Sequence, residues 1–338
     1  MIRIAAPLAM TLALLPAAAM AQGVPKPGAM KTFGDWTVGC DNTNACMMLS
    51  LGTEDPGEAP PTTLLIERAG GGASDFCVTV QPDDDRPRGI AVDGRRLATG
   101  RMTYDGAAAD AIGAAMATGR KLQILATSGT AQSTLSLTGA SAALRYIDAV
   151  QHRVGTVTAA VARGSAPAAR VPAPPAPPVV IALRPSGTAA RPSAAQVAAM
   201  RKAADCDPNG LAGDSTPEQH ALGGGATLVL VPCSAGAYNL ASAAFVLRGG
   251  KVAPARADVP TGYGEDASTA GPAVLVNAAF ENGVLSSYSK GRGVGDCGIS
   301  QNFVWDGARL RLVEQAQMIE CRGNTGLATT WRADVRRR

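Results

Sequence analysis

The residues with the clearest chemistry in this sequence are seven cysteines. In a chain that carries an export signal, as shown below, cysteines are read first as a disulfide framework. Spacing leaves the connectivity open, but closeness along the chain favours three pairs: Cys40–Cys46, Cys206–Cys233 and Cys297–Cys321. Cys77 is then a free thiol within an apolar run, where cysteine behaves as a small buried hydrophobic residue.

Metal and catalytic motifs are missing from the sequence. There is no C-x-x-C pair, no H-E-x-x-H motif and no G-x-S-x-G elbow, so no metal and no cofactor are predicted. A serine or cysteine nucleophile needs a neighbouring base. The two histidines, His152 and His220, are far apart in the sequence, and each is expected to serve local structure. These observations favour a protein that is not an enzyme.

The densest glycine segment spans residues 291–298 and ends beside a cysteine. A phosphate cradle needs such glycines between a strand and a helix N-terminus. Residues 299–305 have the composition of a strand instead, which favours a long turn between two strands. This turn would concentrate charged residues on a loop held by a disulfide, and such a loop is suited to recognition.

Each of the three tryptophans lies near a cysteine in the sequence. One interpretation is that Trp36, Trp305 and Trp331 pack against disulfides. The alternative is that Trp305 or Trp331 anchors a partner, because tryptophan and arginine dominate interface energetics. The predicted contact surface of the C-terminal region comprises Lys290, Arg292, Asp296, Trp305, Arg322 and Trp331.

These residues are expected to lie on two small β-rich domains. Short runs of β-branched and apolar residues alternate with turns throughout the chain, and Asn282-Gly283 and Asp306-Gly307 are strong hairpin signals. Helices are predicted over residues 107–118 and 140–153, and a third begins at the capping box Ser193–Gln196. The predicted class is a β-rich α+β fold, in which each domain has an antiparallel sheet with one or two helices and is stapled by disulfides.

The first 21 residues have the features of a signal peptide. Arg3 precedes an apolar stretch, and Ala19-Met20-Ala21 provides the small-x-small pattern that predicts cleavage before Gln22. We therefore expect a periplasmic protein with no transmembrane anchor in its mature part. Without Arg3 the chain keeps 30 basic and 27 acidic residues, a net charge of about +3, which argues against a nucleic-acid partner.

A proline- and alanine-rich segment divides the mature chain. Residues 165–192 are too rich in proline for a helix or sheet interior and are predicted to form an extended linker. The domain boundaries that follow are residues 28–164 for an N-terminal β-rich domain and residues 193–338 for a C-terminal antiparallel β domain that begins with a helix.

Several motifs resemble an uncharacterised family of exported proteobacterial proteins, the domain-of-unknown-function family numbered 1176. They include the F-G-D-W start at residues 33–36, the segment around residues 136–148 and the pattern at residues 288–298. Two further motifs, V-W-D-G at residues 304–307 and T-W-R at residues 330–332, complete the resemblance. The N-terminal half is also loosely similar to invasion-associated locus B proteins. The resemblance implies a periplasmic protein of this architecture and supplies no catalytic residues.

The leading functional hypothesis is a non-enzymatic binding or interaction module for an unknown periplasmic protein or envelope glycan. A second hypothesis is a cell-envelope hydrolase, or an inhibitor of a wall-degrading enzyme, because two linked domains could engage an extended polymer. A third is a structural tether that joins envelope components through the proline-rich segment.

Overall fold

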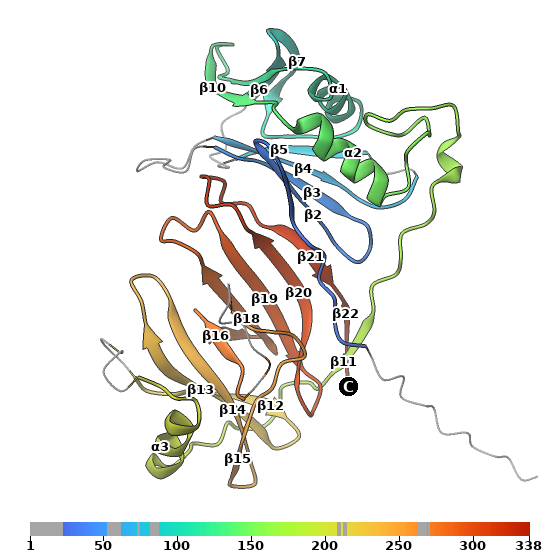
Figure 1. Ribbon diagram of the computed structural model, residues 1–338. Helices are drawn as coiled ribbons and strands as arrows, with labels where there is room; N and C mark the ends of the chain where they lie inside the picture. Colours follow the sequence, from blue (N-terminus) through green and yellow to red (C-terminus); the bar gives the residue numbers. More distant parts are fainter. Residues whose placement is uncertain are drawn as a thin grey trace, which may run out of the picture.

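The computed structural model describes residues 23–52, 62–72, 75–81, 88–207, 211, 215–262, 269 and 271–338. The predicted signal peptide, residues 1–21, lies outside these ranges. The described residues form five β-sheets and three α-helices, together with three disulfides (Figure 1). The predicted β-rich α+β class is therefore confirmed.

The N-terminal half, residues 28–164, is built from two antiparallel sheets and two helices (Figure 1). The first sheet has the order β1 (Lys31–Phe33), β2 (Trp36–Cys40), β3 (Cys46–Ser50), β4 (Thr63–Arg68), β5 (Phe76–Gln81) and β8 (Thr103–Tyr104). The second has the order β10 (Ala131–Ser136), β9 (Lys121–Leu125), β6 (Arg88–Val92) and β7 (Arg95–Arg101). One continuous apolar core joins both sheets to helices α1 (Gly106–Met116) and α2 (Ala140–Val150).

Helix α2 begins at Ala140, where the sequence predicts it to begin, and ends at Val150, three residues before the predicted end. Gly139 is its N-cap, with a φ of 87° that favours glycine. The buried side chains of Ala143, Leu144 and Ile147 lie on the face that packs into the core. The apolar residues that recur about every 3.6 positions in this helix therefore face the first sheet.

The C-terminal half, residues 193–338, is a sandwich of two antiparallel sheets with a helix on its outer face (Figure 1). One sheet has the order β12 (Glu218–Gly223), β13 (Ala226–Ala235), β14 (Leu240–Arg248) and β15 (Lys251–Pro254), and β16 (Val274–Val276) also pairs with β14. The other has the order β17 (Ala279–Glu281), β18 (Val284–Lys290), β19 (Gly298–Trp305), β20 (Leu310–Met318) and β21 (Ala328–Arg332). Helix α3 (Ala194–Ala203) begins at the predicted capping box, in which Ser193 and Gln196 bond to each other's backbone N–H groups.

The segment predicted as a linker runs along the side of the molecule between the two halves (Figure 1). It contains a short 3-10 turn, Ala168–Arg170, and its later part forms strand β11 (Val179–Ala182). Strand β11 pairs in parallel with the last strand, β22 (Asp334–Arg337), and together they cover the outer face of the second C-terminal sheet. The domain boundaries themselves stay a prediction.

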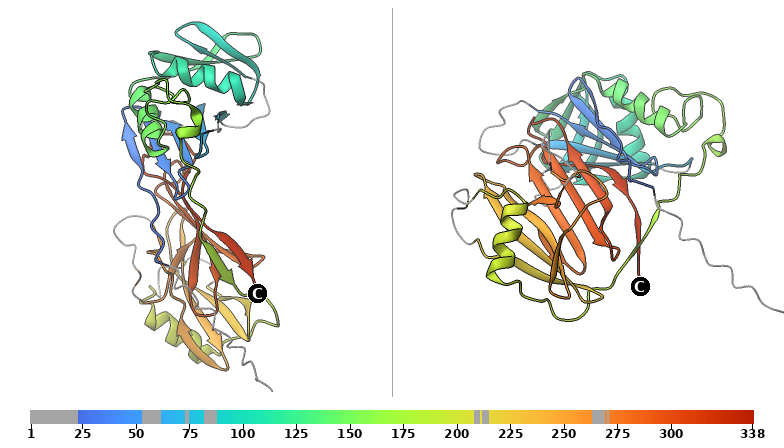
Figure 2. Two further views of the ribbon diagram at one scale, coloured as in Figure 1. Left: turned by 90° about the vertical axis from the view of Figure 1, so that its right-hand side faces the viewer. Right: turned by 60° about the horizontal axis from the view of Figure 1, so that its bottom comes forward.

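The two halves touch through a shared apolar cluster and a set of polar contacts. Leu49 and Leu51 pack with Cys297, Met318 and Ala328, which belong to the C-terminal half. Strand β21 lies beside β2, and Asn42 exchanges hydrogen bonds of 3.0 and 2.8 Å with the backbone of Arg332. Figure 2 shows an elongated molecule in which the two halves are stacked end to end.

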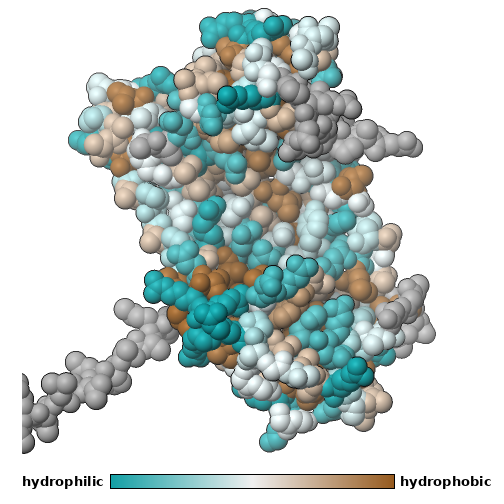
Figure 3. Space-filling view, turned by 180° about the vertical axis from the view of Figure 1, so that it is seen from behind, coloured by the Kyte–Doolittle hydropathy of each residue, from teal (hydrophilic) through white to brown (hydrophobic). Residues whose placement is uncertain are grey.

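The surface mixes apolar and hydrophilic residues. From behind, the densest apolar group lies beside strongly hydrophilic side chains at the lower left (Figure 3). In the described ranges, no helix has the length and apolar character needed to span a bilayer.

Candidate functional site

The loop between β18 and β19 is held in place by a disulfide and a buried ion pair. Cys297 is bonded to Cys321, and the preceding residue, Asp296, is fully buried. The Nε of Arg292 donates to Asp296 Oδ1 at 2.7 Å, and its Nη2 donates to Oδ2. The backbone N–H of Gly323 also donates to Oδ2, at 2.6 Å. The loop is therefore fixed at both its charged residues and its cysteine.

The electrostatics of Asp296 indicate a structural role. Burial acts to raise the pKa of this carboxyl, but hydrogen bonds from Arg292 and Gly323 and the charge of Arg292 outweigh burial and leave the pKa below its ordinary value. Asp296 thus stays ionised at neutral pH and serves as the counter-ion of Arg292. It is not suited to donate a proton as a general acid.

A second turn, residues 236–239, is bonded to this loop. Asn239 Nδ2 donates to the carbonyl oxygen of Lys290 at 2.9 Å, and Tyr238 Oη donates to that of Gly291 at 3.2 Å. Asn277 donates from Nδ2 to the carbonyl oxygens of Tyr238 and Tyr288. These bonds orient the two loops as one rigid unit before any partner arrives.

Apolar side chains are exposed on this unit beside basic ones. Tyr238, Leu240 and Val294 are 40%, 39% and 54% exposed, which is high for large apolar residues. We call Tyr238, Leu240, Lys290, Arg292 and Val294 the loop surface. The sequence predicted Lys290 and Arg292 as part of a contact surface but not the other three. The signal for Tyr238 was an aromatic residue inside a turn between two apolar runs, where no core requires it.

Arg322 lies next to this region but points toward the N-terminal half. Its guanidinium donates to the carbonyl oxygens of Gly52 at 2.9 Å and Gly34 at 3.2 Å, and to Asp35 Oδ1 at 2.8 Å. The hydrogen bond from Arg322 is the main reason why the pKa of Asp35 lies below its ordinary value. Arg322 therefore joins the two halves of the molecule.

The structure does not bring Trp305 and Trp331 to the loop surface. Trp305 is 6% exposed within the sandwich core, and Trp331 packs against the same core from β21. Trp305 lies at the opposite end of β19 from the loop, about 23 Å away for a strand of eight residues. Of the six residues predicted as a contact surface, Lys290, Arg292 and Asp296 lie together, whereas Trp305 is buried in the core and Trp331 is partly buried against it.

The disulfides join the same three cysteine pairs that proximity favoured, and Cys77 is free. Burial, followed by the charge of Glu67, raises the pKa of the Cys77 thiol, which disfavours the reactive thiolate. Among the described residues, no three His, Cys, Asp or Glu side chains are grouped so that they could hold a metal ion. His220 lies in β12, 3.2 Å from Glu218 in the same strand.

The family resemblance covers nearly the whole chain. Residues 30–336 match the family described as "Protein of unknown function (DUF1176)". The chain belongs to this family. It is 29% identical over 317 residues to the uncharacterized protein YpfG of Escherichia coli (strain K12), an alignment that covers 87% of this chain and 89% of YpfG. A weaker structural likeness, with a TM-score of 0.25 and 18% identity, is to invasion associated protein B from Bartonella henselae, over 37% of this chain and 99% of that one.

Proposed function

We propose that this protein is a non-enzymatic binding module of the periplasm and that it contacts a partner protein through the loop surface. The observation that supports this most is the exposure of Tyr238, Leu240 and Val294 beside two basic side chains on a rigid, disulfide-held unit. Exposed apolar residues on a preorganised frame are typical of interaction sites, since little entropy is lost on binding. Tyrosine and arginine are also frequent energetic anchors of interfaces.

The charges of the surface indicate what kind of partner fits it. Arg292 is neutralised by Asp296, whereas Lys290 Nζ lies 5.8 Å from the ring centroid of Tyr288 and forms no ion pair with a described residue. The surface is therefore mainly apolar and aromatic, with one cation available to a partner. A partner protein that presents an apolar patch with an acidic residue at its edge complements it.

The periplasmic location is part of the proposal. Three disulfides are typical of proteins in oxidising compartments, and the sequence predicts export with cleavage before Gln22. N-terminal sequencing of the protein purified from the periplasm should begin at Gln22. Recovery of the uncleaved chain from the cytoplasm would contradict this location.

The contact surface is tested by crosslinking in living cells. The tagged chain, expressed with its own N-terminal segment, is crosslinked in the periplasm and captured material is identified by mass spectrometry. Val294→Ser removes an exposed apolar side chain from the loop surface, and Val154→Ser makes the same change at a comparably exposed residue, 57%, of the N-terminal half. Arg292 and Trp305 are poorer choices, because one balances a buried charge and the other fills the core.

We expect one partner protein to be captured by the wild type and by Val154→Ser and to be lost with Val294→Ser. Equal capture by all three proteins would refute the placement on the loop surface. Capture of an envelope glycan in place of a protein would refute the class of partner.

A further inference from the structure

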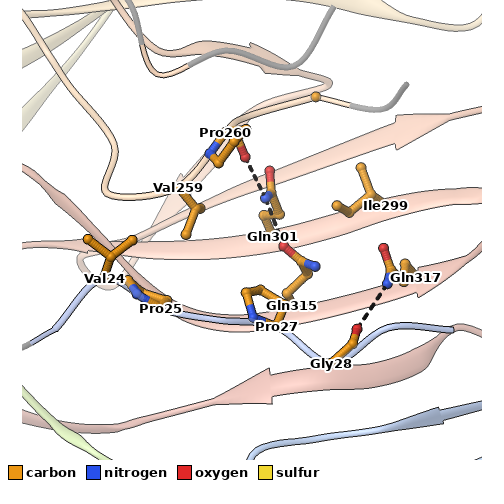
Figure 4. Close-up of a pocket in the computed structure, with 11 residues that line it drawn as sticks. Val24, Pro25, Pro27, Gly28, Val259, Pro260, Ile299, Gln301, Gln315 and Gln317 are labelled. Atoms are coloured by element: carbon orange, nitrogen blue, oxygen red, sulfur yellow. Dashed lines mark hydrogen bonds between the residues drawn. The ribbon is translucent and has the colours of Figure 1, made fainter. Parts of the chain in front are cut away.

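A groove on the inner face of the second C-terminal sheet is distinct from the loop surface and shares no residue with it. It encloses about 410 Å³ between the N-terminal segment 24–28 and the loop 259–262, and the sheet forms its floor (Figure 4). Three glutamines, Gln301, Gln315 and Gln317, provide the polar groups of the lining. The other lining residues are apolar or glycine, namely Val24, Pro25, Pro27, Gly28, Val259, Pro260, Gly262 and Ile299.

Strand pairing brings the glutamines together. Gln301 of β19 lies directly opposite Gln315 of β20, and their amide groups point toward each other (Figure 4). Gln301 Nε2 donates to Gln315 Oε1 and to the carbonyl oxygen of Pro260, both at 3.0 Å. Gln317 Nε2 donates to the carbonyl oxygen of Gly28 at 3.4 Å. The glutamines thus hold both walls of the groove against its floor.

One buried polar atom of this network has no hydrogen-bond partner within the described part of the chain. Gln301 is only 2% exposed, and both of its amide hydrogens are used, yet its Oε1 accepts no hydrogen bond from any residue that the structure describes. A buried carbonyl of this kind is costly unless a donor reaches it. Gln315 and Gln317 each keep an amide hydrogen beyond the single bond that their Nε2 donates. Among the described residues, the glutamine amides of the lining therefore offer two acceptors, the Oε1 atoms of Gln301 and Gln317, and two donors, with no charge.

We infer that this groove binds an extended, uncharged peptide segment of another protein. A peptide backbone supplies alternating N–H donors and C=O acceptors, which is the set that the glutamines leave unmatched. Two of the glutamines already bind main-chain carbonyls, at Pro260 and Gly28, so the floor recognises peptide groups within this molecule. The proline and valine side chains of the walls provide apolar contacts for the side chains of such a segment.

Because its lining residues are neutral, the groove also favours an uncharged ligand. None of the described lining residues has a titratable side chain, so a charged peptide would lose its hydration without gaining an ion pair from them. Binding through this site should accordingly depend little on ionic strength. This property separates it from the loop surface, which presents Lys290.

The probe is a displayed library of random decapeptides that is selected against the full mature protein at high salt. Selected sequences are then made as synthetic peptides with acetylated and amidated ends, and their affinities are measured by calorimetry. Ile299→Trp fills the groove with a larger side chain. Ile319→Trp is the matched control, because Ile319 is 43% exposed and does not line the groove. Thermal unfolding of both variants verifies that they fold.

We expect selected peptides to be uncharged, to bind the wild type and Ile319→Trp alike, and to bind Ile299→Trp at least ~10-fold more weakly, which is about 1.4 kcal/mol. Gln317→Ala, a milder change at a half-buried residue, should weaken binding in the same direction. The inference is overturned if no peptide is selected, if selected peptides bind Ile299→Trp as well as the wild type, or if an oligosaccharide array binds through the groove and peptides do not. Because no residue of the loop surface is changed, these outcomes are independent of capture through Val294.

Discussion

Two buried polar groups of this molecule differ in how completely they are paired. Asp148 in the N-terminal half accepts from the backbone N–H groups of Ala160 at 2.8 Å and Val161 at 2.9 Å, and its Oδ1 lies 3.6 Å from Arg68. Burial lowers the pKa of Arg68 to about 10, so this guanidinium still stays protonated at neutral pH. Gln301 in the C-terminal half is almost as buried, yet none of the described residues donates a hydrogen bond to its Oε1.

The difference shows that buried polar groups can have two different roles. A buried group whose atoms are all matched fixes the fold, and here Asp148 ties the loop around residues 160–162 to helix α2. A buried group with an unmatched atom lowers the stability of the protein until a hydrogen-bond donor reaches that atom. The Asp148 network is therefore structural, and the Oε1 of Gln301 is the atom that the proposed peptide ligand would match.

The largest expected effect on the free energy of unfolding comes from replacing Asp148. Asp148→Ala leaves Arg68 buried without its counter-ion and three backbone N–H groups without an acceptor, which should lower the free energy of unfolding by about 3–5 kcal/mol. Urea unfolding of the mature protein measures it. Asp334→Ala, at an exposed aspartate of β22, is the control and should change stability by less than about 0.5 kcal/mol. Similar values for the two variants would show that the Asp148 network is not structural.

A smaller effect on the free energy of unfolding is expected for two substitutions in the groove. They differ in which polar atoms they leave without a hydrogen-bond partner. Gln301→Met removes the unpartnered Oε1 along with two donated bonds, so its cost should stay within about 1–2 kcal/mol. Gln315→Met leaves an amide hydrogen of Gln301 without an acceptor and does not remove the Oε1 that is already unmatched, so it should cost more. The same urea series compares them, and a larger cost for Gln301→Met would mean that its Oε1 is matched in solution.

The smallest expected effect is the acid dependence of the contact between the halves. The pKa of Asp35 is lower in the folded protein than its ordinary value, chiefly through the hydrogen bond from Arg322. Its contribution to stability is therefore complete above the unfolded-state pKa, about 3.9, and is lost as the pH falls through the lower folded-state pKa.

Thermal unfolding followed through this acidic range tests the contribution of Asp35. Asp35→Asn should lower the melting temperature at neutral pH and should flatten its fall below about pH 4. Asp334→Asn serves as the control for loss of a carboxylate. An unchanged acid profile in Asp35→Asn would assign the acid sensitivity to other carboxyl groups, such as Asp296.

The features that could be predicted from the sequence are those set by neighbouring residues. The capping box at Ser193, the turn at Asn282-Gly283 with its positive φ angles and the three cysteine pairs each depend on short spacings. In each case local backbone preferences and short loops leave few alternatives.

The site depends on contacts between residues that are far apart in the sequence. The spacing of residues along the chain does not predict such contacts. Gln301 meets Gln315 only through the register of β19 and β20, which shifts at an irregularity between Asn302 and Phe303. Arg322 meets Asp35, 287 residues away in the sequence. Trp305 was considered as a partner anchor because its type is common at interfaces, but alternation along β19 places it in the sandwich core.

Site-resolved photocrosslinking in the periplasm tests the proposed binding module most directly. A photoreactive amino acid is placed at Tyr238 on the loop surface and, as the control, at Val157, which is 51% exposed on the N-terminal half. The proposal predicts that one defined adduct with a partner protein forms from position 238 and that none forms from position 157. No adduct from position 238, or the same adducts from both positions, would contradict it.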